Sequence, residues 1–165
     1  MATWGDLEAA DPELAAFGRA RIDGQVSFLA TVRGDGSPRV HPVTPWVTEG
    51  RLFVRMYLTS PKGMDLRRDP RFALHSMMDN DDGVGGEFAV RGRGRVITDA
   101  DLAADAYEAI GGPGTDRPLV LFELGLDEVV ATEYDGDVPV RRRWRDGGVA
   151  GRRYATRPAE PSGAE

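Results

Sequence analysis

The sequence predicts a mainly β fold with a few short peripheral helices. Three strand-like segments follow one another before residue 60 and are separated by turn signals. The chain has 165 residues, which is enough for one hydrophobic core. Apolar residues make up 41% of the chain and charged residues 29%, proportions typical of a globular domain. We therefore expect one domain over residues 1–157, followed by a disordered tail at 158–165.

The first three strands are expected at residues 25–33, 39–47 and 51–58, where they should form a meander. The residues Gly34-Asp35-Gly36-Ser37 separate the first two strands and are a hairpin signal. Pro42 and Pro45 lack a backbone N–H, so the second strand must lie at an edge of the sheet or bend.

The remaining elements are helices and strands in mixed order. A helix is expected at 12–22, because Asp11 can cap it and Pro12 suits its first position. A second helix begins with Ser60-Pro61-Lys62 and ends at Asp69-Pro70. The other predicted elements are strands at 72–78, 87–98, 118–124, 129–134 and 138–145, a helix at 99–110, and loops at 79–86 and 111–116.

The cations are unevenly distributed along a chain whose net charge is −6. Residues 140–157 hold seven Arg against Asp146 alone, and residues 33–71 are also net positive. A nucleic-acid-binding domain is usually basic as a whole, so an acidic domain with two basic segments favours a small anionic ligand. We expect no nucleic-acid partner.

The chain contains no cysteine, which excludes disulfides, thiolate metal sites and cysteine nucleophiles. Its first residues lack the basic and apolar regions of a secretory signal, and no apolar stretch is long enough to span a membrane. We therefore expect a cytoplasmic protein that has no membrane partner.

Neither the histidines nor the glycine-rich segments match a known metal or nucleotide motif. His41 and His75 have no third histidine at metal-ligand spacing, so no metal site is expected, although His41 is the better candidate for touching a ligand. The runs at 92–94 and 111–114 match neither the dinucleotide-binding nor the P-loop fingerprint, and we interpret them as turns. The acidic run at 79–82 lacks the spaced ligands of a calcium-binding EF-hand loop.

Ser60, Pro61 and Lys62 form the clearest candidate ligand site. They open a predicted helix directly after a strand, within the net-positive segment 33–71. A helix N-terminus presents free N–H groups and a partial positive charge, so a hydroxyl and an ammonium there suit a phosphate. Of the 21 Lys and Arg residues, Lys62 is the one lysine, and lysine binds phosphate as a mobile point charge.

From about residue 11 to 145 the sequence resembles the pyridoxamine 5'-phosphate oxidase-like flavin and deazaflavin oxidoreductases, which have a split β-barrel fold of the FMN-binding type. Five segments carry the resemblance in order and spacing: residues 26–32, 36–43, 60–62, 65–71, which end in Asp69-Pro70-Arg71, and 87–94. Each segment is weak alone, and the set is fairly specific.

The resemblance implies a homodimer with two cofactors at the subunit interface and a small-molecule substrate. It assigns the cofactor phosphate to Ser60 and Lys62, and the adjoining strand positions to Arg55 and Met56. The flavin ring would run along Val40, His41, Pro42, Val43 and Thr44. On the last strand, Arg143 matches a cofactor-contacting arginine, and Arg141 and Trp144 are the candidate substrate contacts. In such enzymes the cofactor carries the redox chemistry, so we name no catalytic residue.

Two departures from the family pattern leave the activity and cofactor open. Pro139-Val140-Arg141 replaces an Arg-x-His pair that grips the vitamin substrate, which argues against vitamin oxidation. Pro61 replaces a second phosphate-binding arginine of many members. We expect FMN as the cofactor, with the deazaflavin coenzyme F-420 as the alternative and haem as a third possibility. The alternatives to an enzyme are a non-catalytic flavin-binding or storage protein, a haem-binding protein, and a domain that binds nucleic acid through residues 139–157.

Overall fold

The structure is a computed structural model, and it describes residues 1–78, 85–112, 114–136, 138–147 and 154–155. The elements in chain order are α1 Trp4–Ala10, α2 Pro12–Ile22, β1 Ser27–Val32, β2 Pro38–Val43, β3 Pro45–Thr48, β4 Arg51–Tyr57, α3 Pro61–Arg68, β5 Arg71–Ser76, β6 Glu87–Val96, α4 Ala100–Ala109, β7 Leu119–Asp135, β8 Val138–Arg145 and β9 Tyr154–Ala155.

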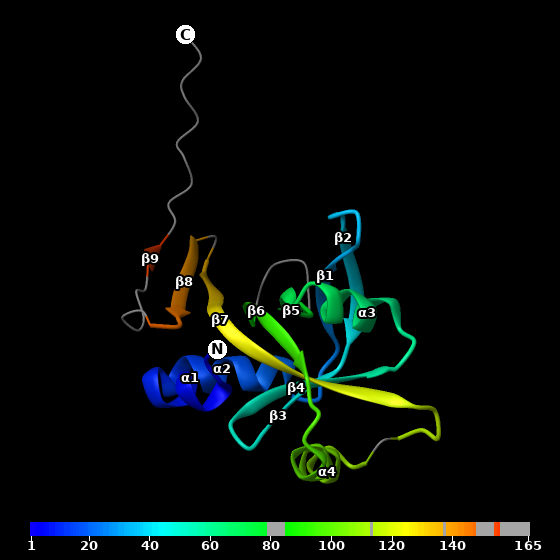
Figure 1. The fold of residues 1–165 in the computed structure, drawn as a ribbon. Coiled ribbons are helices and arrows are strands. Elements are labelled where there is room, and N and C mark those ends of the chain that lie inside the picture. Colours follow the sequence, from blue (N-terminus) through cyan, green and yellow to red (C-terminus); the bar gives the residue numbers. More distant parts are fainter. Residues whose placement is uncertain (79–84, 113, 137, 148–153, 156–165) are drawn as a thin grey trace.

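Within the described residues the strands form one nine-stranded antiparallel sheet. The order is β2-β1-β5-β6-β7-β4-β3, and β8 pairs with β7 beyond the end of β4 and with β9 on its other side. The sheet curls into an open barrel with the helices at its periphery (Figure 1). The predicted fold, a mainly β split barrel with short helices, is confirmed.

The strand predicted at 39–47 is two strands that lie at opposite edges of the sheet. β2 ends at Val43 and β3 begins at Pro45, so only Thr44 separates the two edges. The prolines thus occur where a missing N–H is tolerated. Both hairpin pairings of the predicted meander are present, β1 with β2 and β3 with β4, but the three predicted strands do not form one continuous meander because β2 and β3 lie at opposite edges.

The strands predicted at 118–124 and 129–134 are one long strand, β7. The ladder between β6 and β7 continues through this region with a register shift between Arg91 and Gly92. A Cβ atom on Gly92 would lie 1.8 Å from the Gly125 carbonyl oxygen. Gly92 therefore lets the two backbones approach closely beside the register shift, where the sequence predicts a break between two strands.

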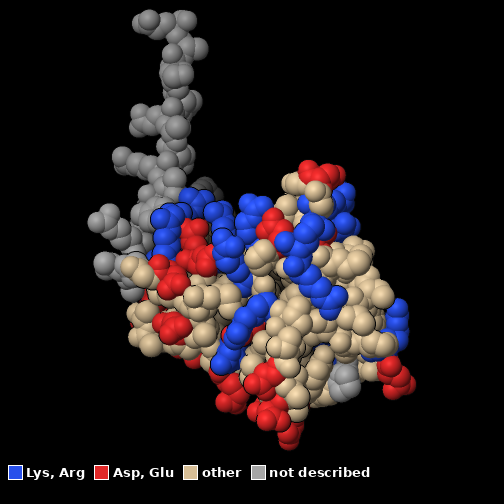
Figure 2. Space-filling view, in the orientation of Figure 1, with Lys and Arg blue, Asp and Glu red and all other residues tan. Residues whose placement is uncertain are grey.

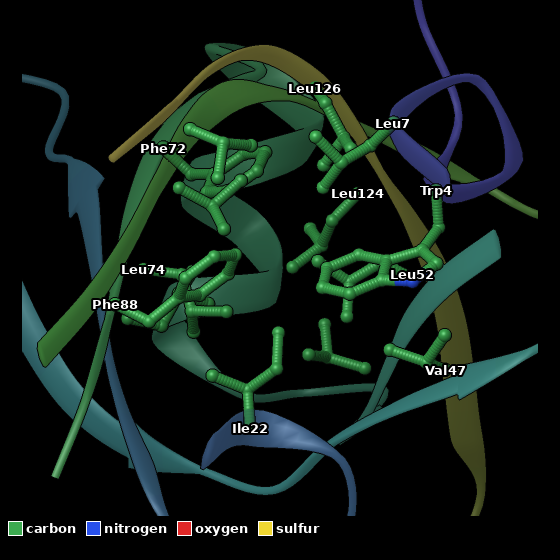
Figure 3. Packing of buried hydrophobic residues seen from close by; sticks show 14 of the residues in the cluster. Trp4, Leu7, Ile22, Val47, Leu52, Phe72, Leu74, Phe88, Leu124 and Leu126 are labelled. Atoms are coloured by element: carbon green, nitrogen blue, oxygen red, sulfur yellow. The ribbon is translucent and has the colours of Figure 1, made fainter. Parts of the chain in front are cut away.

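The main core lies inside the barrel and is closed by α1 and α2 (Figure 3). Trp4 and Leu7 of α1 and Leu14 and Ile22 of α2 are fully buried there. The predicted helices at 12–22, 60–69 and 99–110 correspond to α2, α3 and α4. The sequence reading missed α1, which a capping box of Thr3 and Asp6 begins.

α4 covers the opposite face of the sheet, where it forms a second and smaller cluster. Phe53 of β4, Leu121 of β7 and Ala106 of α4 are buried in this cluster. Phe53 alternates along β4 with Leu52 and Val54, which belong to the main core. β4 is therefore covered on both faces.

Two of the sequence predictions concern residues outside the described ranges. The predicted tail at 158–165 and most of the predicted loop at 79–86 lie outside the described residues. β9 lies in a stretch for which no strand was predicted. In the described part of the chain no helix has the length and apolar character needed to cross a membrane.

Gly18 of α2 provides a test of the packing between helix and sheet. A Cβ atom at Gly18 would lie 2.2 Å from Cζ of Phe88, a ring that is fully buried. Gly18→Ala should therefore lower the free energy of unfolding by about 1–3 kcal/mol through overpacking, although alanine is the better helix former by about 1 kcal/mol. Urea unfolding measures the change, and a more stable Gly18→Ala protein would contradict this packing. The matched control is Ala16→Gly at an exposed position of the same helix, which should lose only the helix propensity.

Candidate cofactor-binding site

The turn between β4 and α3 presents Ser60, Pro61 and Lys62 at the start of a helix, as the sequence predicts. The hydroxyl oxygen of Ser60 accepts a hydrogen bond from the Gly63 N–H at 3.2 Å, and Pro61 takes the first helical position. Ser60 is buried and serves as the helix cap. Its hydroxyl proton remains a donor, so the cap does not prevent Ser60 from binding a ligand oxygen.

A pocket of about 300 Å³ opens beside this turn. It brings together four of the predicted site residues, namely Thr44, Arg55, Met56 and Lys62. Its other lining residues are Trp46, Tyr57, Gly114, Thr115 and Leu119. Two cations and three hydroxyls beside aromatic and apolar groups suit an anionic group attached to an organic chain.

Lys62 is a partly buried cation in this pocket. Burial lowers the pKa of the Lys62 ammonium below its ordinary value, because the charged form loses hydration. An anion beside it would restore a favourable environment for the charge. The pocket therefore favours binding of a negatively charged ligand over a neutral one.

Arg55 is the second cation of the pocket, and the structure records its contacts. Its Nη1 donates to the carbonyl oxygen of Gly112, and its guanidinium carbon lies 4.7 Å from the centroid of the Trp46 ring. Such stacking on an indole face stabilises a guanidinium. These contacts orient Arg55 at the wall of the pocket.

His41 lies on β2 opposite Leu29 of β1, and it is partly buried. The pKa of His41 is lowered by burial, and the positive charges of Lys62, Arg39 and Arg33 lower it further. His41 is therefore within electrostatic reach of the Lys62 turn and remains neutral at neutral pH. A neutral imidazole offers one donor and one acceptor to a ligand.

The other predicted residues of β2 do not share one environment. Val40 is 59% exposed and Pro42 is exposed on the outer face of the sheet, whereas Val43 is buried in the main core. Alternation along the strand places Val40 and Pro42 on the face opposite His41, whereas Val43 lies on the same face as His41 but is buried. Only Thr44, at the end of this run, lines the pocket.

Asp65 of α3 fixes the helix against the first two strands. Its carboxylate accepts hydrogen bonds from Thr31 Oγ1 at 3.0 Å, Arg39 Nε at 2.6 Å and Arg68 Nη2 at 3.1 Å. Burial acts to raise the pKa of Asp65, but these hydrogen bonds outweigh burial and hold the pKa below its usual value. Asp65 thus stays ionised and sets the position of the Lys62 turn.

The predicted residues of β8 lie away from this pocket within one chain. Arg141 and Arg143 line a second pocket of about 230 Å³ on the outer face of β6, β7 and β8. Arg143 Nε lies 3.0 Å from Glu128 Oε1. Figure 2 shows cationic and acidic side chains mixed over this part of the molecule. Trp144 alternates with Arg143 and is buried in the main core, so its indole packs there and lines neither of these pockets.

The sequence reading missed the pocket residues that lie outside the recognised motifs. Trp46 comes from β3, and Gly114 and Thr115 come from the loop after α4. That loop was interpreted as a turn because its glycines match no nucleotide-binding fingerprint. The run of glycines was the one available signal, since glycine permits close approach of a backbone to another group.

Among the described residues no three His, Asp or Glu side chains gather in a way that could hold a metal ion. The fold and the site together define a split-barrel protein whose cationic pocket lies at the junction of a strand and a short helix. A family model described as pyridoxamine 5'-phosphate oxidase matches residues 11–132. The chain therefore belongs to the pyridoxamine 5'-phosphate oxidase family.

Solved structures of the same fold differ in what they are described as binding. A pyridoxamine 5'-phosphate oxidase-related, FMN-binding protein from Nostoc punctiforme is 17% identical with a TM-score of 0.64, over 92% of this chain and 97% of that chain. An F-420 reductase is 18% identical with a TM-score of 0.52, and the match covers 67% of this chain and 94% of that chain. HutZ, the heme storage protein of Vibrio cholerae, is 18% identical with a TM-score of 0.57, and the match covers 71% of this chain and 89% of that chain. No curated protein matches the sequence.

Removal of the Asp65 charge tests how the site is held in place. Because the folded pKa of Asp65 is depressed, its contribution to stability is present above the unfolded pKa of about 3.9 and is lost as the pH falls. Asp65→Asn should lower the free energy of unfolding at pH 7 by about 1–3 kcal/mol and make stability less dependent on pH in the acid range. Denaturant unfolding from pH 3 to 7 measures both effects.

The matched control is Glu8→Gln, which removes an exposed ion pair with Arg19. This change should leave stability and its pH dependence almost unaltered. Equal behaviour of the two variants would show that Asp65 has no special role.

Proposed function

We propose that this protein is an oxidoreductase that binds a flavin-type cofactor, FMN in the first place, and exchanges a hydride or electrons with a small organic substrate. The observation that carries the proposal is the pocket beside α3, where Lys62 and Arg55 meet a helix N-terminus. Membership of the pyridoxamine 5'-phosphate oxidase family supports it. A related reading is a flavin-binding protein that does not catalyse a reaction.

The residues of the pocket fit the phosphate end of such a cofactor. Lys62 and Arg55 would neutralise the phosphate, and the hydroxyls of Ser60 and Thr44 would donate to its oxygens. Met56 supplies apolar cover that excludes water from the chain next to the phosphate. When bound, the flavin supplies the redox chemistry, and the protein positions it and shapes the surrounding charge.

The pocket is large enough to hold only part of a flavin cofactor. Its volume of about 300 Å³ is at the low end of small-molecule sites, which range from roughly 300 to 1,000 Å³. The remaining part of the ligand therefore needs cover from another surface. A second copy of the chain would supply it, and the partner subunit's Arg143 and Arg141 are the groups proposed to reach the cofactor and substrate.

The outer face of β2 and β1 is the surface proposed for this homodimer. Phe28 is 40% exposed and Val40 is 59% exposed there, beside Pro42, which pairs with Phe28. A further apolar hollow lies next to them, lined in part by Ala30, Pro38 and Ala73. A contiguous exposed apolar patch is typical of an interface.

Absorption spectroscopy of the purified protein and of its extracted cofactor distinguishes the candidates. Flavin absorption bands would support FMN, and a deazaflavin spectrum would support coenzyme F-420. A Soret band would indicate haem and overturn the flavin proposal. A flavin that is bound but not reduced by any donor tested would favour the non-catalytic reading.

Lys62→Ala should weaken binding of FMN, because it removes a charged donor from the phosphate end of the pocket. The expected loss is about 1.5–3 kcal/mol, or roughly 10- to 150-fold in Kd. Fluorescence titration of apoprotein with FMN measures it, and Arg67→Ala, an exposed cation at the far end of α3, is the control. Unchanged affinity in Lys62→Ala would show that the phosphate binds elsewhere.

Phe28→Asp combined with Val40→Asp should convert the dimer to a monomer, because it introduces charges into the proposed apolar interface. Light scattering after size-exclusion chromatography measures the mass in solution. Met64→Glu, at a side chain of α3 that is 51% exposed, is a control outside this face and should leave the mass unchanged. A wild-type protein that is monomeric at all concentrations would refute the homodimer.

A further inference from the structure

The guanidinium of Arg55 touches two parts of the molecule at once. It lines the pocket together with Lys62. Its Nη1 also donates to the carbonyl oxygen of Gly112, in the loop that follows α4. Its guanidinium carbon also lies over the Trp46 ring, 4.7 Å from the ring centroid, and this cation–π contact helps to hold the side chain between these two partners.

The loop after α4 is shaped to receive this side chain. A Cβ atom on Gly114 would lie 3.2 Å from Arg55 Nη2, and Gly114 has a φ of +68°, so glycine suits this position on both grounds. The loop is also tied to the end of α4. The Gly112 N–H donates to the Tyr107 carbonyl at 2.6 Å, and the Gly111 N–H donates to the Glu108 carbonyl at 3.1 Å.

α4 itself is held to the sheet by few buried contacts. Ala106 is its one fully buried residue, and the cluster that it joins has Phe53 and Leu121 as further buried members. Leu102 and Tyr107 of α4 pack against this cluster and are partly buried. Figure 1 shows α4 below the sheet, apart from the other helices. The charged hydrogen bond from Arg55 to Gly112 therefore adds to a small apolar cluster in keeping this segment in place.

We propose that Arg55 is a positioning residue that couples an anion in the pocket to the ordering of α4 and its following loop. A guanidinium has five N–H donors in a planar fork. Arg55 can therefore keep its bond to Gly112 while another N–H donates to a phosphate oxygen. A bound phosphate fixes the guanidinium, and residues 100–112 open less often as a result. The ligand half of this coupling rests on the proposed function, and the contact between Arg55 and Gly112 does not.

Hydrogen exchange of the free protein tests the contact without any ligand. Arg55→Gln should make the amides of residues 106–112 exchange at least about tenfold faster, as expected for loss of a charged hydrogen bond. Arg117→Gln is the matched control, because Arg117 stacks on Tyr57 at 4.1 Å and is an arginine beside the same pocket. The amides of β6 report global unfolding and should be unchanged in both variants. Equal exchange in wild type and Arg55→Gln would overturn the proposal.

Hydrogen exchange at saturating FMN tests the coupling. FMN should slow exchange at residues 106–112 in the wild type and should leave it unaltered in Arg55→Gln, even where that variant is fully loaded. The same slowing in both proteins would overturn the coupling. Arg55→Lys keeps the charge but lacks the planar fork, so it should bind FMN and still fail to transmit the effect. If FMN does not bind the wild type at all, the proposed function fails, and the free-protein experiment still decides the Arg55–Gly112 contact.

Discussion

The carboxylate of Asp65 determines where the turn with Lys62 lies relative to the sheet. It accepts hydrogen bonds from Thr31 of β1, Arg39 of β2 and Arg68 of its own helix. Arg68 also donates to the carbonyl of Val32. A charged group with this many donors is costly to separate from them. The helix is thereby fixed against the β1–β2 hairpin, and Lys62, one turn earlier, is fixed beside β2.

This attachment combines with the path of the chain to assemble the pocket. β2 and β3 lie at opposite edges of the sheet and only Thr44 joins them, so the chain crosses the open side of the barrel at that residue. Trp46 and Arg55 then come from the far edge, and Lys62 comes from the helix that Asp65 holds. The opening of the split barrel is therefore the place where cationic and apolar groups of distant segments meet.

Features set by local chemistry could be predicted from the sequence, and features set by distant contacts could not. Ser60 and Pro61 mark the start of α3 through capping and proline geometry, which act within one turn. The continuity of β7 shows instead in its long pairing with β6, where Gly92 lies against the Gly125 carbonyl. The burial of Trp144 depends on which face of β8 meets the core. The position of Trp46 beside Arg55 depends on how the sheet curls. Neither face nor curl is encoded in a short segment.

The two cations of the pocket differ in a way that fits their positions. Lys62 is a point charge on a flexible chain at a helix start, so it can follow a phosphate but fixes no direction. The guanidinium of Arg55 is planar, lies over the Trp46 ring and donates to the Gly112 carbonyl. It can therefore offer a ligand only the N–H groups that these contacts do not use. Pro61 contributes no cation at the helix turn, and Arg55 supplies one from the strand. In the proposed complex, β4 and the loop after α4 therefore set the direction from which the second charge meets the ligand. We expect specificity for the group attached to the phosphate to depend on those elements more than on the helix.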